Sequence, residues 1–205
     1  MVTRASQPSP RRVPPLWGLV LAGGTGSRIG RDKGELDYHG VPQARWAFDL
    51  LAGFCERCYV SVRPEQARIG VYATLPLIPD QLSGGPAAGL LTAWGLAPGV
   101  AWLLLATDMP LIDETVLETL VRGRAPGATA TAFRRPDGML EPLCAIWEPG
   151  AAQAMLSRTP ASVSLRAVLE TSTVAVLAMA DASRFRSVNT ARDDLDLRAR
   201  IAAGS

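Results

Sequence analysis

The chain has 205 residues, of which 48% are hydrophobic, so it can bury a sizeable core within one domain. Its formal net charge of +2 excludes a chain-wide electrostatic attraction to nucleic acid or to an acidic membrane surface. No run of about 18 apolar residues occurs, which excludes a transmembrane helix.

The first fifteen residues contain four prolines and three arginines but no apolar segment of the kind found in signal peptides. We therefore expect a disordered tail over residues 1–15 and one folded domain over residues 16–203. Cys55 and Cys58 form a C-x-x-C pair without a second pair, and the chain has one histidine, so a zinc site is disfavoured. Reduced, structural thiols are typical of cytoplasmic proteins, and we expect that location.

Residues 16–35, L-W-G-L-V-L-A-G-G-T-G-S-R-I-G-R-D-K-G-E, change abruptly from an apolar run to glycines and then to cations. The run 16–21 has the length and the β-prone residues of a strand buried on both faces. Glycines let backbone N–H groups approach a ligand closely, and neighbouring cations add the positive charge that a polyphosphate requires. The glycines are Gly23, Gly24, Gly26 and Gly30, and the cations are Arg28, Arg31 and Lys33. This stretch predicts a phosphate-binding loop after a first buried strand.

Two better-known loops do not fit this stretch. A Walker A loop needs Gly-Lys followed by Ser or Thr, whereas Asp32 precedes Lys33 and Gly34 follows it. A dinucleotide fingerprint needs G-x-G-x-x-G, and Gly30 comes one residue too late for that spacing. It also needs an acid that ends a second strand, but Asp49 lies in W-A-F-D-L-L-A, which is typical of a helix.

Further along the chain, short apolar runs alternate with amphipathic segments. The predicted strands span residues 16–21, 57–62, 75–78, 101–107, 128–133, 140–147 and 173–177. The predicted helices span residues 42 to about 53, 87–96, 113 or 114 to 121, about 150–157, 164–170 and 191 onward. This alternation implies βαβ units, so we expect an α/β fold with a single-domain, doubly wound and mostly parallel sheet of the Rossmann-like type.

Ligands of such sheets bind beyond the carboxyl ends of the strands, where three segments converge: the glycine-rich loop, Asp80 and Asp108. Asp108 ends the apolar run A-W-L-L-L-A-T, and a carboxylate there is costly to bury unless it is paired or bound to a metal such as Mg²⁺. Its alternative role is to cap the turn before Pro110. Asp80 precedes a second glycine-rich segment and can accept hydrogen bonds from a guanine base or a ribose, or it can start a turn.

L-A-G-G-T-G-S-R-I-G-R-D-K resembles the L-A-G-G-x-S-x-R-M-G-x-x-K signature of nucleotidyltransferases, and specifically that of the molybdenum cofactor guanylyltransferase family. Gly26 departs from the signature serine and Ile29 from the methionine. The resemblance implies Mg²⁺-dependent transfer of GMP from GTP to molybdopterin, with release of pyrophosphate. It also implies partners among molybdenum-insertion or molybdoenzyme-maturation proteins, and neither nucleic acid nor a membrane.

The resemblance also implies roles for individual residues. Arg28, Lys33 and Asp108 would be catalytic, and Asp108 would hold the metal. The nucleotide site would comprise Leu21, Ala22, Gly23, Gly24, Thr25, Gly26, Lys33, Ser61, Asp80, Gly85 and Asp108. Asn189 would contact the acceptor, or cap the last helix together with Thr190. Taken singly, Arg28 and Lys33 could equally be solvated surface charges.

Several alternatives remain open from the sequence. The pair Gly23-Gly24 favours guanine because relatives with L-A-A-G in the loop tend to use CTP, so a cytidylyltransferase acting on the same cofactor is the first alternative. A sugar-phosphate nucleotidyltransferase is the second. A non-catalytic nucleotide-binding protein that assists molybdoenzyme assembly belongs to a different class, and the presence of Lys33 and Asp108 argues against it.

Overall fold

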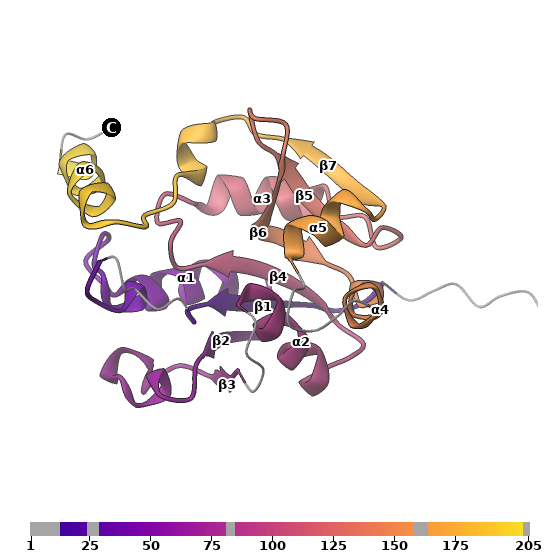
Figure 1. The fold of residues 1–205 in the computed structure, drawn as a ribbon, viewed down its shortest axis with the longest axis horizontal. Coiled ribbons are helices and arrows are strands. Elements are labelled where there is room, and N and C mark those ends of the chain that lie inside the picture. Colours follow the sequence, from indigo (N-terminus) through magenta and orange to yellow (C-terminus); the bar gives the residue numbers. More distant parts are fainter. Residues whose placement is uncertain (1–12, 24–28, 81–84, 158–163, 203–205) are drawn as a thin grey trace, which may run out of the picture.

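The computed structural model describes residues 13–23, 29–80, 85–157 and 164–202. Seven strands form one sheet in the order β3-β2-β1-β4-β6-β5-β7 (Figure 1). The strands are β1 (Leu16–Leu21), β2 (Cys58–Val62), β3 (Leu77–Pro79), β4 (Ala101–Ala106), β5 (Ala130–Arg134), β6 (Leu140–Trp147) and β7 (Val174–Ala178). The predicted α/β fold is therefore confirmed.

The helices agree closely with the expected ones. The α-helices are α1 (Gln43–Ala52), α2 (Pro86–Leu96), α3 (Glu114–Arg122), α4 (Gly150–Leu156), α5 (Leu165–Glu170) and α6 (Ala191–Ala202). The 3₁₀ helices are η1 (Lys33–Glu35), η2 (Gln66–Arg68), η3 (Gly70–Tyr72) and η5 (Ala182–Phe185). Local capping explains several boundaries: the Asp113 carboxylate accepts from Val116 N–H at the start of α3, and Ser164 caps α5.

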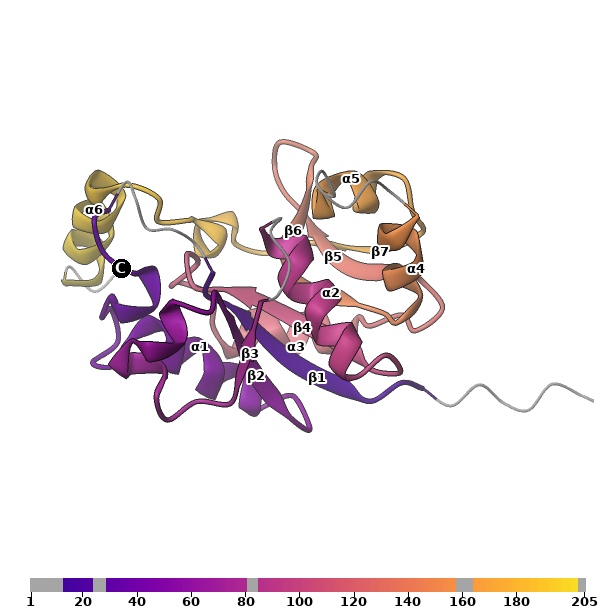
Figure 2. The same cartoon turned by 60° about the horizontal axis from the view of Figure 1, so that its bottom comes forward.

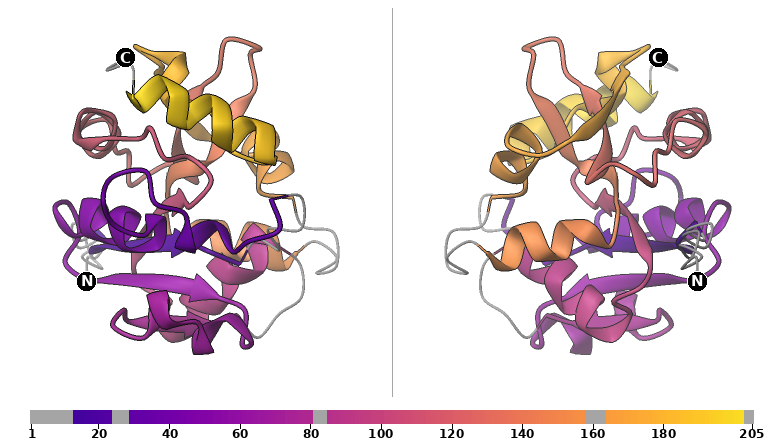
Figure 3. Two further views of the ribbon diagram at one scale, coloured as in Figure 1. Left: turned by 90° about the vertical axis from the view of Figure 1, so that its left-hand side faces the viewer. Right: turned by 90° about the vertical axis from the view of Figure 1, so that its right-hand side faces the viewer.

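Helices cover both faces of the sheet, as in a doubly wound fold. Figure 3 shows α1 and α3 on one face and α2, α4 and α5 on the other. α1 contacts β1 and β2, and α3 contacts β5 and β6. α2 contacts β1, β2 and β3 from the opposite side. The central strands are therefore buried on both faces.

The sheet is mixed, and β6 is the strand that makes it so. The pairs β1–β2, β1–β4, β2–β3 and β5–β7 are parallel, whereas β6 is antiparallel to both β4 and β5. The expectation of a mostly parallel sheet holds for four of the six pairings. The exception follows from the R-R-P-D-G turn, because a hairpin of this length returns the chain antiparallel to β5.

The core lies along β1 and β4. Leu19 and Val20 of β1 and Leu103 and Leu104 of β4 have no exposed side-chain surface. In register, Leu21 pairs with Ser61 of β2 on one side and with Ala106 of β4 on the other. The three central strands therefore end at one common edge of the sheet.

Some predicted boundaries are displaced by one or two residues. β3 begins at Leu77 rather than at position 75, because Leu75 donates its N–H to Tyr72 and closes a turn. β5 begins at Ala130 rather than at position 128, because Ala128 donates to Ala125 in another turn. In both places the apolar residues begin before the strand does, so the sequence pattern predicted the first residue of the strand too early.

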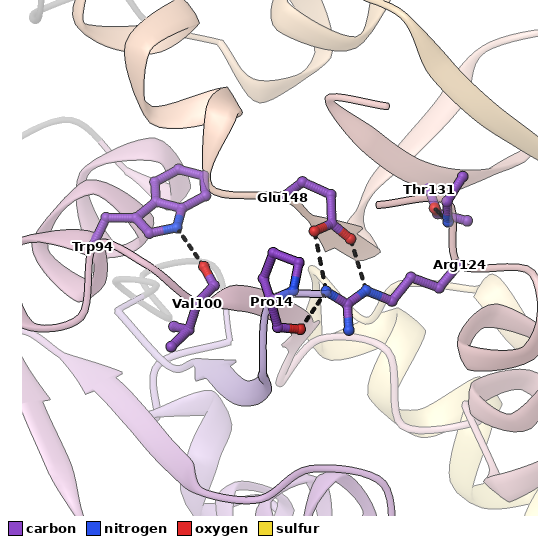
Figure 4. Close-up of polar contacts among 7 residues, drawn as sticks. Pro14, Trp94, Val100, Arg124, Thr131 and Glu148 are labelled. Carbon is purple, nitrogen blue, oxygen red and sulfur yellow. Dashed lines mark hydrogen bonds and ion pairs between the residues drawn. The ribbon is translucent and has the colours of Figure 1, made fainter. Parts of the chain in front are cut away.

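The start of β1 is fixed by a buried ion pair on the side opposite to the common edge. Arg124 Nε and Nη2 contact the two carboxylate oxygens of Glu148 at 2.7 and 3.1 Å, and Arg124 Nη2 also donates to the Pro14 carbonyl at 2.8 Å (Figure 4). Pro15 accepts the N–H of Ala101 at 2.9 Å. Pro14 and Pro15 therefore belong to the folded unit, although both fell within the expected tail; residues 1–12 lie outside the described part.

The C-terminal helix packs on a small core of its own. Leu197 of α6 is buried against Leu36, Tyr38 and Val188, separately from the main core. The Tyr38 hydroxyl donates to Asp194 of α6 at 2.8 Å. Figures 1 and 2 both show α6 on the side of the molecule away from the start of β1. The central strands end on this side, so α6 lies next to their common edge.

Within the described ranges, no helix has the length and apolar character needed to span a bilayer.

Candidate functional site

The candidate site lies at the common edge where β1, β2, β3 and β4 end. Gly23 follows β1, Arg63 follows β2, Asp80 follows β3 and Asp108 lies two residues after β4. This edge is the crevice in which open α/β sheets bind their ligands. Of the segments that the sequence predicted to converge here, the structure places Asp80, Asp108 and Gly23, the described start of the first loop, at this edge.

Lys33 lies at this edge, between Asn189 and Asp108. Its ammonium group donates to Asn189 Oδ1 at 2.8 Å and lies 3.8 Å from Asp108 Oδ2. The Lys33 side chain is only 14% exposed, so it is not a solvated surface charge in this structure. The contact with Asn189 joins two segments that are 156 positions apart in sequence.

The amino-acid usage of the whole chain gives a further signal for Lys33. The chain has 21 basic residues, and Lys33 is its only lysine, because the other 20 are arginines. An ammonium group is a compact charge with three donors, whereas a guanidinium is a planar fork. The short distances to Asn189 and Asp108 fit the compact group, which offers a reason for a lysine at this one position.

Asp108 sits in the turn after β4 and is held there by its backbone, because its carbonyl accepts the N–H of Val188 at 2.7 Å. Its side chain is 18% exposed, and Oδ1 is buried without a hydrogen-bond partner among the described residues. Burial raises the pKa of Asp108, and the positive charge of Lys33 partly offsets this increase. A buried carboxylate oxygen without a partner fits a hard cation such as Mg²⁺, which prefers carboxylate ligands.

The structure separates the two roles considered for Asn189. Thr190 is the residue that caps α6, because its hydroxyl accepts a hydrogen bond from Asp193 N–H at 3.1 Å. The Asp193 carboxylate in turn accepts from the backbone N–H groups of Asn189 and Thr190 at 3.0 and 2.8 Å. The hydrogen bond from the Asn189 backbone is the largest cause of a lowered pKa at Asp193. The Asn189 side chain is therefore left to face Lys33.

The base-binding and sugar-binding candidates lie around the start of α2. Asp80 Oδ1 accepts from the Thr92 hydroxyl at 3.2 Å. Ser61 is 3% exposed, and its hydroxyl lies against Gly89, where an added Cβ would be 2.6 Å from Oγ. Gly85 has φ of 70° just before α2, a conformation that L side chains rarely adopt. The structure therefore places Ser61 under the first turns of α2.

The first loop is described only at its flanks. Leu21 accepts from Thr107 N–H at 3.2 Å, and Ala22 N–H donates to Ser61 at 2.9 Å, so the strand pairing continues up to Gly23. The predicted binding residues Gly24, Thr25, Gly26 and Arg28 lie outside the described residues.

Sequence reasoning missed two charged residues at this edge. Glu141 of β6 is 4% exposed and contacts Arg135 at 3.2 Å. Burial raises the pKa of Glu141, and the negative charge of Asp108 adds to this increase, which places the two carboxylates near each other. Arg63 lies beside Gly23, with Cγ 3.9 Å from the position of an added Cβ. The sequence did offer a signal for Arg63, because this residue directly follows a predicted parallel strand.

His39 has a structural role, as its isolated position suggested. Its Nε2 lies 2.8 Å from the Pro110 carbonyl, and its ring stacks on Trp46 at a centroid distance of 4.0 Å. A carbonyl can only accept a hydrogen bond, so Nε2 carries the proton in this tautomer. His39 thus fastens the turn after β4 to α1 and does not reach the site.

Comparisons with known proteins show the family to which the chain belongs. The family model described as the MobA-like NTP transferase domain matches residues 18–178. A molybdenum cofactor biosynthesis bifunctional protein from Synechocystis sp. is 40% identical over 141 residues, which are 68% of this chain and 41% of that protein. A molybdenum cofactor guanylyltransferase from Pseudomonas paraeruginosa is 36% identical over 135 residues, which are 64% of this chain and 67% of that protein.

A solved structure shows the same fold. The crystal structure of molybdopterin-guanine dinucleotide biosynthesis protein A from Archaeoglobus fulgidus matches with a TM-score of 0.72 and 23% identity, covering 92% of this chain and 100% of that one. The family match begins in β1 and ends at the last residue of β7, so it includes all or part of every strand together with Lys33 and Asp108. On this coverage, the chain belongs to the MobA-like NTP transferase domain family.

Proposed function

We propose that this chain transfers GMP from GTP to the terminal phosphate of a molybdopterin-type acceptor and releases pyrophosphate. The proximity of Lys33 and Asp108 at the common strand edge supports this proposal most strongly, because Asp108 Oδ1 is buried and has no hydrogen-bond partner in the described part of the chain. The acceptor and the nucleotide are inferred from the family and from the names of two relatives. Since the chain covers 41% of the bifunctional relative, only the transferase activity is carried over.

In this reaction an oxygen of the acceptor phosphate attacks the α-phosphorus of GTP. A phosphoanhydride bond forms there, the bond from the α-phosphorus to the bridging oxygen breaks, and pyrophosphate leaves with the electron pair. The chemistry needs no side-chain nucleophile. The protein contributes orientation and positive charge that stabilises the phosphate oxygens as the transition state develops.

Lys33 is the described residue best placed to supply that charge. Its ammonium group lies beside Asn189 and Asp108, which come from segments far apart in the sequence, so it is held in place before a ligand arrives. A triphosphate at the edge would compete for Lys33 with Asp108, whose carboxylate would then be free for a cation. Mg²⁺ held by Asp108 would neutralise phosphate charge and act as a Lewis acid.

Asp80 and the start of α2 are the proposed contacts for the base and the sugar, with Asn189 on the acceptor side. Asp80 is partly exposed at the end of β3, where a carboxylate can accept hydrogen bonds from a guanine or from a ribose. We favour guanine over cytosine because Gly23-Gly24 follows the guanine-using pattern. A cytidylyltransferase acting on the same acceptor is the second candidate, on the same nucleotide site.

We also propose a cytoplasmic location and contacts with molybdenum-insertion or molybdoenzyme-maturation proteins. The location is supported by the family and by Cys55, Cys58 and Cys144, which are all free thiols. The contacts are supported by the resemblance alone.

The test is pyrophosphate release with each nucleoside triphosphate, Mg²⁺ and purified molybdopterin. GTP is expected to support turnover, and Asp108→Asn or Lys33→Ala to lower kcat/KM by about 100-fold or more. The exposed ion pair of Glu118 and Arg122 on α3 supplies matched controls, because Glu118→Gln and Arg122→Ala remove similar charges that contact neither Lys33 nor Asp108.

Each alternative has its own outcome. Turnover with CTP but not with GTP would favour the cytidylyltransferase. Nucleotide-dependent thermal stabilisation without turnover would favour a binding protein that assists assembly. Full activity in Asp108→Asn would refute the assignment of the site.

A further inference from the structure

We propose that Gln66 is a positioning residue that, with Asp32 and Tyr72, joins the two flanks of the first loop and sets Lys33 in place. We name these three residues the flank clamp. The inference rests on the proposed function in one respect: Lys33 is taken as the phosphate-binding cation.

Gln66 makes four hydrogen bonds while being almost completely buried. It is 2% exposed; its Nε2 donates to the Ala22 carbonyl at 2.9 Å and to Asp32 Oδ2 at 2.5 Å. Its Oε1 accepts from the N–H and the Nε of Arg63 at 3.0 and 3.1 Å. The first two partners are 44 and 34 positions away in sequence, one before the loop and one after it. One side chain therefore joins both flanks.

Asp32 completes the clamp on the side of Lys33. Its Oδ1 accepts from Gly34 N–H at 2.8 Å and from the Tyr72 hydroxyl at 2.7 Å, while Oδ2 accepts from Gln66. Tyr72 is fully buried, and burial followed by its contact with Asp32 raises its pKa, so the hydroxyl remains a donor. Asp32 directly precedes Lys33, so three donors fix the backbone from which Lys33 projects.

The same glutamine also orients a second cation. Arg63 lies beside Gly23, and its Nε donates a hydrogen bond to Gln66 Oε1. Glu65 also contacts this Nε at 3.3 Å, but Glu65 is 67% exposed. The clamp thus connects the two cations, Arg63 and Lys33, that lie on opposite flanks of the loop.

Packing alone does not account for this arrangement. A buried polar network stabilises a fold no better than well-packed apolar side chains of similar volume, and it is costly when any member lacks a partner. What a network adds is a defined geometry, since each donor must meet its acceptor at a fixed distance and angle. The flanks of a phosphate loop are a place where such precision affects chemistry.

The first experiment measures the reactivity of Lys33 in the nucleotide-free full-length chain. An amine-specific acylating reagent can modify only Lys33 and the terminal amine, and peptide mapping separates the two. Gln66→Met keeps the length of the side chain and removes its hydrogen bonds. We expect faster acylation of Lys33 in this variant, together with a kcat/KM for GTP lowered by about 10- to 100-fold. Gln153→Met, on the exposed face of α4, is the matched control and should change neither value.

A purely structural role would change different quantities. It would lower the melting temperature and leave Lys33 acylation and the KM for GTP unchanged in the protein that remains folded. Tyr72→Phe removes only one hydroxyl, so it provides a mild second variant if Gln66→Met is poorly folded. We expect a smaller change in the same direction for Tyr72→Phe.

A swap tests the contact between Asp32 and Gln66 directly. Asp32→Asn places two donors opposite each other, and Gln66→Glu places two acceptors opposite each other. The double variant restores one donor and one acceptor, so it should recover part of the kcat/KM lost in each single variant.

Wild-type acylation rates in both Gln66→Met and Tyr72→Phe would overturn the proposal, as would a swap that recovers nothing. Absence of GTP turnover in the wild-type protein would instead refute the proposed function. In that case the acylation rates would still show whether the flank clamp holds Lys33 in place.

Discussion

Gly34 offers a direct test of how tightly the flank clamp is packed. A Cβ at Gly34 would lie 2.2 Å from the Tyr72 hydroxyl oxygen, 3.0 Å from its Cζ and 3.1 Å from Ala44 Cβ. Tyr72 has no exposed surface, so its ring cannot swing away without disturbing the core. Gly34→Ala must therefore displace the hydroxyl that donates to Asp32 at 2.7 Å.

The expected loss combines two contributions. Overpacking of a filled core costs about 1–3 kcal/mol, and loss of a hydrogen bond to a charged acceptor costs about 1.5–3 kcal/mol. We therefore expect Gly34→Ala to lower the free energy of unfolding by roughly 3–5 kcal/mol, because both contributions apply at once. For a chain of this size, such a loss lowers the melting temperature by roughly 6–20 °C.

The assay is a thermal double-mutant cycle of wild type, Gly34→Ala, Tyr72→Phe and the double variant. Removal of the hydroxyl eliminates the 2.2 Å contact and leaves the 3.0 Å contact with Cζ, so the double variant should melt above Gly34→Ala alone. Gly95→Ala is the control, because nothing lies within 4 Å of its added Cβ and alanine favours the helix. Additive losses, or a wild-type melting temperature for Gly34→Ala, would refute the reasoning.

Three further predictions concern other parts of the chain. Glu148→Gln leaves the buried charge of Arg124 unpaired and should cost about 3–5 kcal/mol in chemical denaturation, with kcat unchanged because the pair lies away from the site; a shift below 1 kcal/mol would contradict this. Thr190→Ala removes the cap of α6 and should lower stability by about 0.5–2 kcal/mol. It should also raise the KM for GTP, because Asn189, the hydrogen-bond partner of Lys33, loses its support; an unchanged KM would show that the cap does not affect the site. Burial raises the pKa of Asp108, so the folded protein binds a proton where the unfolded chain has lost it, and that stabilisation disappears as the pH rises. In thermal scans, the melting temperature of Asp108→Asn relative to that of the wild type should therefore rise as the pH increases above the ordinary aspartate pKa of about 3.9, and a constant difference would argue against a raised pKa.

The sequence predicted the parts of the fold that depend on local pattern. The continuous apolar run before Asp108 indicated a central strand, and the resulting α/β topology brings the ends of β1 and β4 together. The position of Asp108 beside the first loop followed from that topology. The antiparallel direction of β6 was implied by the turn before it, although the overall description did not include it.

Tertiary contacts account for what the sequence did not predict. Gln66 lies in the segment after β2, and no local pattern in the sequence showed that it would be buried between two flanks of a distant loop. Likewise, the approach of Asn189 to Lys33 depends on the docking of α6 on its small core. Glu141 is buried near Asp108 only because β6 pairs with β4.

The single lysine also has a consequence for proteolysis. An endoproteinase that cleaves only after lysine can cut this chain at one place, between Lys33 and Gly34, and so releases β1 on a fragment of 33 residues. β1 pairs with both β2 and β4, so that one cut would remove a central strand of the sheet. The rate of a single cleavage would therefore report how often η1 opens within the candidate site.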